Sequence, residues 1–155
     1  MNVPAKATNR ALVTLPCLCA NLRRTTRAMS QLYDQAFRPL GLRGTQFTIL
    51  QVLERAGEIT QGDLGEMLAM DSTTLTRTLH IMLRHGWIAE RPGEDRRQRW
   101  LRLAKSGRAL LARATPAWTE LQTKLARELG ESSWQALFKL TSEVASLATT
   151  QGDVS

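Results

Sequence analysis

The residues in this sequence best suited to chemistry are hydroxyl and guanidinium side chains between Asp71 and Arg84. Several of them recur at i, i+4, i+7 and i+11, a spacing that gathers them on one face of a helix, while apolar residues occupy the other face. Side chains of these types form hydrogen bonds with base edges in the major groove of DNA. The segment therefore predicts a recognition helix whose candidate DNA-contacting residues are Ser72, Thr73, Thr74, Thr76, Arg77, His80 and Arg84.

A basic loop between two short stretches of alternating polarity follows this helix. Residues 87–91 and 100–104 alternate with period two, which predicts two strands, with a turn at Pro92-Gly93 after the first. Ile59 favours a third strand. Residues 71–108 hold nine Lys or Arg and four Asp or Glu, so +5 of the net charge of +7 lies in about a quarter of the chain. The loop is therefore predicted to be a basic wing, and its candidate contact residues are Asp95, Arg96, Arg97 and Arg99.

Helix and wing together resemble the DNA-binding half of the MarR family of bacterial transcription regulators, whose wing carries the motif Asp-x-Arg. Asp95-Arg96-Arg97 supplies that motif, although Leu103-Ala104 stands where members usually have Leu-Thr. The resemblance implies that Arg97 enters the minor groove and that Asp95 orients it. This agrees with the concentration of negative potential in a narrow groove. Family spacings around the motif are also matched by Leu79, Leu83, Gly86, Ile88, Arg91, Leu103 and Gly107.

Local signals predict where the helices begin and end. Thr60, with Asp63 three residues later, predicts the start of a short helix before the recognition helix. Gly86 predicts the end of the recognition helix, because a residue with positive φ at that place favours glycine. Pro116 should kink a long helix that starts at about residue 106, or remove one of its backbone hydrogen bonds. A capping box at Ser132 predicts the last helix.

The predicted fold class is mainly α with a small β-wing (α+β). Residues 13–148 are expected to form a single MarR-like domain, preceded by a mobile arm at 1–12 and followed by a polar tail at 149–155. The winged helix-turn-helix lobe spans about 43–105, and both chain ends, about 15–38 and 106–148, form a helical lobe. Wide apolar stripes on these terminal helices need a partner. A homodimer would cover them and would place two recognition helices on a pseudo-palindromic operator, roughly 34 Å apart.

Composition limits the class of protein and its partners. With 43% hydrophobic and 23% charged residues, the sequence is typical of globular proteins, and a pI near 10.4 favours a polyanionic partner. No apolar run is long enough to cross a membrane, and Pro16 interrupts the one stretch that could resemble a signal peptide. We therefore expect a cytoplasmic bacterial protein with no membrane partner, associated with the nucleoid when bound to double-stranded DNA.

Two cysteines near the first helix raise the question of a sensor. The order Leu18-Cys19, Arg27 and Tyr33 resembles the organic hydroperoxide-sensing branch of the family, in which a cysteine at this place is oxidised. Arg23 replaces a tyrosine of that branch, and the chain has no second thiol near the C-terminus. The alternative, which the frequency of buried unreactive cysteines favours, is that both thiols simply pack as small apolar groups. The candidate effector or redox residues are Cys19, Cys17, Tyr33, Arg23 and Arg27.

The other effector that the resemblance allows is a small aromatic anion in a cleft between the two lobes, with Arg23, Arg24 or Arg27 holding its carboxylate. No metal and no cofactor are predicted. A metal clip made by Cys17 and Cys19 is disfavoured because two residues that lie two positions apart point to different helix faces.

Two further classes of function compete with a transcription regulator, which we expect to be a repressor. One is an architectural protein that binds DNA by charge alone and would show a specific-to-nonspecific affinity ratio near one. The other is an enzyme, which is not predicted because the sequence has no nucleophile–base spacing, phosphate-binding glycine loop or paired carboxylates on an apolar face.

Overall fold

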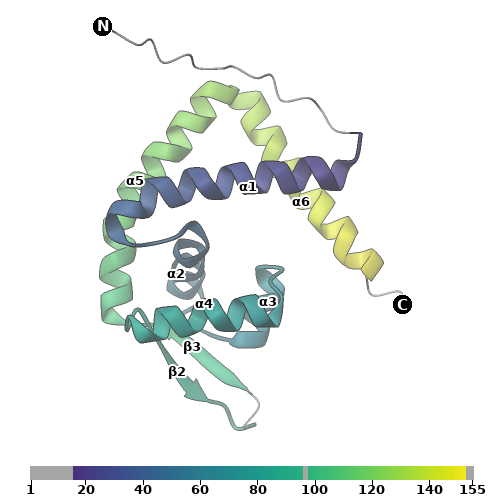
Figure 1. Ribbon diagram of the computed structural model, residues 1–155. Helices are drawn as coiled ribbons and strands as arrows, with labels where there is room; N and C mark the ends of the chain where they lie inside the picture. Colours follow the sequence, from purple (N-terminus) through teal and green to yellow (C-terminus); the bar gives the residue numbers. More distant parts are fainter. Residues whose placement is uncertain (1–15, 96–97, 153–155) are drawn as a thin grey trace, which may run out of the picture.

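The computed structural model describes residues 16–95 and 98–152, and it is mostly helical with one small sheet (Figure 1). This confirms the predicted fold class. The predicted arm at 1–12 and the last three residues of the predicted tail lie outside the described residues. The elements are α1 (Leu18–Phe37), η1 (Arg38–Leu40), α2 (Gly44–Ala56), β1 (Glu58–Thr60), α3 (Gln61–Met67), α4 (Ser72–Arg84), β2 (Ile88–Pro92), β3 (Arg99–Leu103), α5 (Lys105–Leu129) and α6 (Glu131–Gly152).

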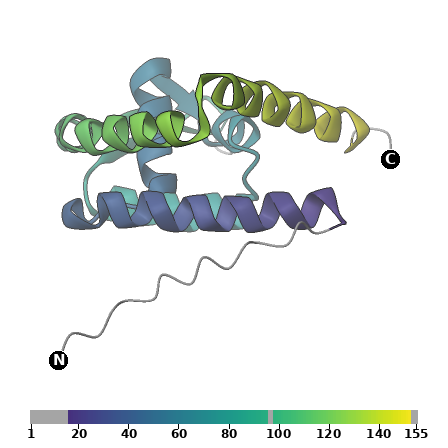
Figure 2. The same ribbon diagram turned by 90° about the horizontal axis from the view of Figure 1, so that it is seen from above.

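Two lobes share α2 and the first half of α5. The winged lobe holds α2, α3, α4 and the sheet, with the β2–β3 hairpin extending away from the helices (Figure 1). The other lobe is built from both ends of the chain. Seen from above, α1 lies on one side and α5 with α6 on the other, with α2 between them (Figure 2).

The sheet is antiparallel with strand order β1-β3-β2. Leu101 pairs with Ile59 on one side, and Leu103 pairs with Ile88 on the other. These four residues are buried, which explains the period-two pattern, because alternate residues of a strand face the same side of the sheet. The third strand expected at Ile59 is therefore present as β1.

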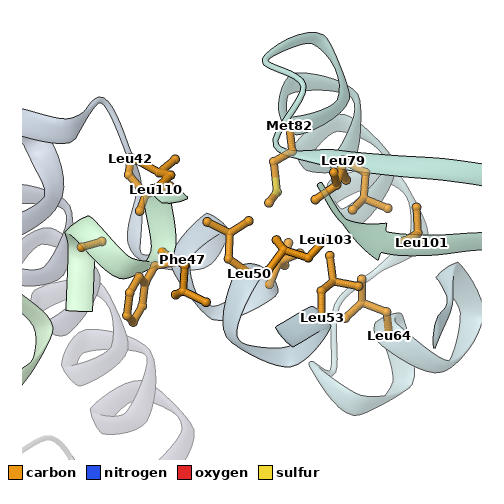
Figure 3. Close-up of a cluster of buried hydrophobic side chains, with 14 of the residues drawn as sticks. Leu42, Phe47, Leu50, Leu53, Leu64, Leu79, Met82, Leu101, Leu103 and Leu110 are labelled. Carbon is orange, nitrogen blue, oxygen red and sulfur yellow. The ribbon is translucent and has the colours of Figure 1, made fainter. Parts of the chain in front are cut away.

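Helix α2 forms the centre of the core. Phe47, Leu50 and Leu53 are each at most 2% exposed and lie along one side of this helix. Figure 3 shows these side chains between Leu110 of α5 and Leu101 of β3. From the other direction Leu64, Leu79 and Met82 bring α3 and α4 onto the same cluster (Figure 3). The apolar face of α4 is thereby fixed against the core, so its opposite face must point outward.

Pro116 lies inside α5, which runs from Lys105 to Leu129. The last helix differs from the sequence expectations in two ways. The capping box expected at Ser132 is not formed, because α6 already begins at Glu131, whose carboxylate accepts a hydrogen bond from Gln135 (2.5 Å). Helix α6 also continues to Gly152, into the segment predicted to be a polar tail.

In the part of the chain that the structure describes, no helix combines the length and the apolar character that crossing a bilayer requires.

Candidate nucleic-acid interface

Both ends of α4 are fixed by local hydrogen bonds. Asp71 is the N-cap residue, and its Oδ1 accepts a hydrogen bond from the backbone N–H of Thr74 at 2.9 Å. The hydroxyl and backbone of Thr74 together hold the pKa of Asp71 below its ordinary value. At the other end, Gly86 adopts φ 68°, and the N–H of Trp87 donates to the carbonyl of Met82 at 3.0 Å. The exposed face of α4 is therefore presented at a defined length and orientation.

The outward face of α4 carries the predicted polar set. Leu75, Leu79 and Met82 are at most 3% exposed and hold the inner face against the core. The predicted side chains Ser72, Thr73, Thr76, Arg77, His80 and Arg84 are all exposed. This arrangement offers hydroxyl and guanidinium donors on one surface, which is the chemistry of major-groove recognition.

Thr74 is the exception within the predicted set. Its hydroxyl and its N–H are both directed to Asp71, and the residue lines a cavity on the far side of α4. Thr78, which the sequence did not single out, lines the same cavity and donates its hydroxyl to the carbonyl of Thr74 at 2.9 Å. Thr74 therefore belongs to the N-cap, and the other six predicted residues of α4 form the candidate surface.

An ion-paired network stiffens the base of the wing. The guanidinium of Arg91 on β2 donates two hydrogen bonds to the carboxylate of Glu58 on β1, at 2.9 and 2.6 Å. Its central carbon also lies 5.2 Å from the ring centroid of Trp100 on β3, the strand between them. The hydrogen bonds from Arg91 lower the pKa of Glu58. Sequence reasoning missed this pair because the partners are brought together only by the strand order.

Beyond this network, the wing turns back at an exposed loop. The N–H of Gly93 donates to the carbonyl of Gln98, and the N–H of Gln98 donates to the carbonyl of Asp95, both at 2.9 Å. Asp95 and Arg99 are exposed, and Arg99 pairs with Glu90 at 3.3 Å. Arg96 and Arg97 lie outside the described residues. Of the predicted wing contacts, the structure therefore describes Asp95 and Arg99, both at the loop end of the hairpin.

A cavity of about 1360 Å³ separates the winged lobe from the terminal helices. Tyr33 lies in its wall, and its Oη accepts a hydrogen bond from Nε2 of Gln122 at 2.9 Å. Burial raises the pKa of Tyr33. The lining is mixed, with aromatic side chains at Trp87, Trp118 and Trp134 beside threonines of α1 and α4. Such a space suits an organic molecule with a polar group.

The cations at this cavity are not those expected from the sequence. Arg43 and Arg55 line it, whereas Arg23, Arg24 and Arg27 do not. The helical period explains the difference, since the residues of α1 that face the cavity follow the stripe that includes Tyr33, and these three arginines fall off it. Arg43 and Arg55 could have been predicted as cavity residues only if it were known that α2 packs against α1.

Cys17 and Cys19 are both exposed at the start of α1, where Cys17 is the N-cap residue. Neither thiol is packed within the protomer, so the packing interpretation finds no support in the single chain. Within residues 16–95 and 98–152, no three His, Cys, Asp or Glu side chains lie close enough to hold a metal ion.

Comparison with known proteins agrees with this geometry. Residues 40–98 match the model of the MarR family. The uncharacterized HTH-type transcriptional regulator YwoH of Bacillus subtilis is 28% identical over 57% of this chain and 64% of its own length. The multiple antibiotic resistance protein MarR of Salmonella typhimurium is 35% identical over 52% of this chain and 56% of its own length. The matches therefore span less than two thirds of these two relatives.

Solved structures cover more of the chain. The transcriptional regulator MosR of M. tuberculosis, in complex with DNA, is 33% identical over 86% of this chain and 97% of that protein, with a TM-score of 0.79. A mutant MarR of E. coli complexed with operator DNA, 24% identical over 82% of this chain and 92% of its own, has a TM-score of 0.73 and supports the fold. These homologues are transcription regulators and not enzymes. The chain belongs to the MarR family of winged-helix transcription regulators.

Proposed function

We propose that the protein is a homodimeric, sequence-specific DNA-binding regulator, and that it acts as a repressor released by a small molecule or by oxidation of Cys19. The observation that carries this proposal is the exposed hydroxyl and guanidinium face of α4, held at a fixed orientation by its two ends and its buried leucines and methionine. Its position beside a basic hairpin gives one surface with donors for base edges and charge for phosphates.

Each part of this surface has a distinct role in the proposal. The six α4 residues from Ser72 to Arg84 enter the major groove, with Arg77 at the centre of the face as the strongest base reader. The proposed wing contacts are Asp95, Arg96, Arg97 and Arg99, and Arg97 enters the minor groove as the family resemblance implies. Replacing Arg97 with alanine should weaken operator binding, since an inserted guanidinium would be lost.

An unpaired apolar surface supports the homodimer. Leu18 at the start of α1 is 62% exposed, and Phe138 and Leu147 on α6 are 55% and 63% exposed. Trp134 packs edge-on against Phe138, with ring centroids 5.0 Å apart. Large apolar side chains gathered on terminal helices mark an interface with another chain. A two-fold axis through this surface would present two copies of α4 to successive major grooves.

Two signals could release the protein from its operator, namely peroxide and a small aromatic anion. The matched variants Cys17→Ser and Cys19→Ser distinguish between them. Peroxide can oxidise an exposed thiolate to a sulfenic acid, and both cysteines are exposed. If Cys19 is the sensor, peroxide should release wild type and Cys17→Ser from the operator but leave Cys19→Ser bound. If all three proteins ignore peroxide, Cys19 is not the sensor, and small aromatic acids that could bind in the cavity near Arg43 and Arg55 are tested next.

The test of the proposal is a fluorescence-anisotropy titration onto duplex DNA from the protein's own promoter region and onto a scrambled duplex, at two salt concentrations. A base-reading regulator retains a preference of about 10³-fold or more for its operator as salt rises. A protein that binds by charge alone would lose affinity for both duplexes together and show a ratio near one. That second result would favour the architectural alternative.

A further inference from the structure

The threonine hydroxyls of α4 do not all have the same partner. A threonine in a helix commonly donates its hydroxyl to the carbonyl four residues earlier. Thr78 does this within α4, at 2.9 Å from the carbonyl of Thr74, and Thr115 does so in α5, at 2.8 Å from the carbonyl of Leu111. Thr76 is different, because its Oγ1 accepts a hydrogen bond at 2.9 Å from Nε2 of Gln61, the first residue of α3.

This bond determines what the Thr76 hydroxyl can still do. A hydroxyl has one donor and two acceptor positions, and Gln61 occupies an acceptor position. The proton of Thr76 is therefore left to donate, and among the residues that the structure describes no acceptor for it is found. Thr76 is exposed on the surface proposed to meet DNA. Its hydroxyl proton is thus available to donate at this surface.

Gln61 is itself held firmly in place. The N-terminus of α3 is capped by Thr60, whose Oγ1 accepts from the N–H of Asp63 at 3.1 Å and donates to its carboxylate at 2.6 Å. One turn later Leu64 is completely buried in the core. The amide of Gln61 therefore reaches Thr76 from a helix that cannot easily shift.

We propose that Gln61 is a positioning residue for base recognition, which fixes the Thr76 hydroxyl as a hydrogen-bond donor toward one base in each half of the operator. This inference rests on the proposed function. A fixed donor prefers a base edge that offers an acceptor in the major groove, namely guanine, adenine or thymine, and disfavours cytosine, which offers an amino donor there. Without Gln61 the hydroxyl can rotate, or bond to its own helix as in Thr78, and the preference weakens.

The experiment is a double-mutant cycle read out as base preference. Gln61→Met removes the amide at similar size, Thr76→Val removes the hydroxyl at similar shape, and the double variant combines them. Thr78→Val is the matched control, because its hydroxyl is already used inside α4. Each protein is titrated onto the operator, onto operators with each half-site base replaced by cytosine, and onto scrambled DNA, and its thermal midpoint is measured.

The expected result is that Gln61→Met and Thr76→Val both lose about 3- to 10-fold of the discrimination at the same base position, which is the effect of one hydrogen bond. The double variant should lose no more than Thr76→Val alone. Thr78→Val should discriminate like the wild type, and the thermal midpoint of Gln61→Met should stay within about 3 °C of it, as a change of under 1 kcal/mol allows.

Three outcomes would overturn the inference while leaving the proposed function intact. A further loss from Gln61→Met in the Thr76→Val background would mean that Gln61 contacts DNA itself. An equal loss on operator and scrambled DNA would mean a phosphate contact or a weakened fold. Unchanged discrimination in Gln61→Met would mean that the hydrogen bond has no role in recognition. Failure of the wild type to distinguish operator from scrambled DNA would instead contradict the proposed function, and the inference with it.

Discussion

Replacing Gly107 with alanine tests how closely α5 approaches the wing. A Cβ at this position would lie 2.0 Å from the carbonyl oxygen of Trp87 and 2.9 Å from Cδ1 of Leu103, whereas ordinary contacts begin at 3.4 Å. The helix and the segment before β2 would have to separate by about 1.4 Å, the difference between 3.4 and 2.0 Å. That movement would break the 3.0 Å hydrogen bond from the N–H of Ala104 to the same carbonyl.

The expected stability change follows from two opposing terms. Overpacking lowers the free energy of unfolding by about 1–3 kcal/mol, and by more where the backbone must move. Replacing glycine with alanine inside a helix raises it by about 1 kcal/mol. Gly107→Ala should therefore lose about 2 kcal/mol or more, which lowers the thermal midpoint by roughly 4–8 °C in a protein of this size. Operator affinity should also fall, because Trp87 leads directly into the wing.

Gly62→Ala provides the matched control in a second helix. Its Cβ would meet only Oγ1 of Thr60, at 3.8 Å, so the helix-propensity term acts alone and the midpoint should stay equal or rise. Thermal unfolding of both variants and of the wild type is measured by circular dichroism at one protein concentration, and the operator affinity of each is measured in parallel. Equal or increased stability of Gly107→Ala would refute the reasoning, since it would mean that α5 does not approach the Trp87 carbonyl as described.

Two further predictions concern the core and the base of the wing. Phe47 is 2% exposed, and its ring centroid lies 4.5 Å from that of Phe37. Phe47→Ala should therefore lower the free energy of unfolding, measured with urea, by about 3–5 kcal/mol. A decrease below about 1 kcal/mol would contradict this packing. Arg91 lowers the pKa of Glu58 below its usual 4.5, so the stability advantage of wild type over Glu58→Gln should be fully present above pH 4.5 and should shrink as pH falls through the lowered pKa. Thermal midpoints of both proteins across the acid range measure this, and an advantage that grows with acidification would show that the pair is not formed.

The features that sequence predicts well here are local ones. Gly86 acts on backbone groups within a few residues, so its type and position were enough to predict the C-terminal end of α4. The buried face of α4 and the strands of the wing follow from periodicity in the same way.

The features that sequence could not provide depend on which elements become neighbours. Glu58 and Arg91 meet only because β3 lies beside both of their strands. Arg55 reaches the cavity because α2 passes beneath α1, and Thr76 meets Gln61 because α3 crosses α4 at that point. In each case the residue types were visible, but the distance between them is set by tertiary structure.

The most direct test of the central claim compares two arginine variants of equal charge change. Arg77 lies on the exposed face of α4, and Arg113 is exposed on α5. The ratio of Kd for scrambled DNA to Kd for operator is measured for wild type, Arg77→Ala and Arg113→Ala. Recognition through α4 predicts that Arg77→Ala loses about 5- to 150-fold of the ratio, equivalent to about 1–3 kcal/mol, while Arg113→Ala keeps it. Equal ratios for all three proteins, or equal losses in both variants, would contradict the assignment of α4 as the base-reading helix.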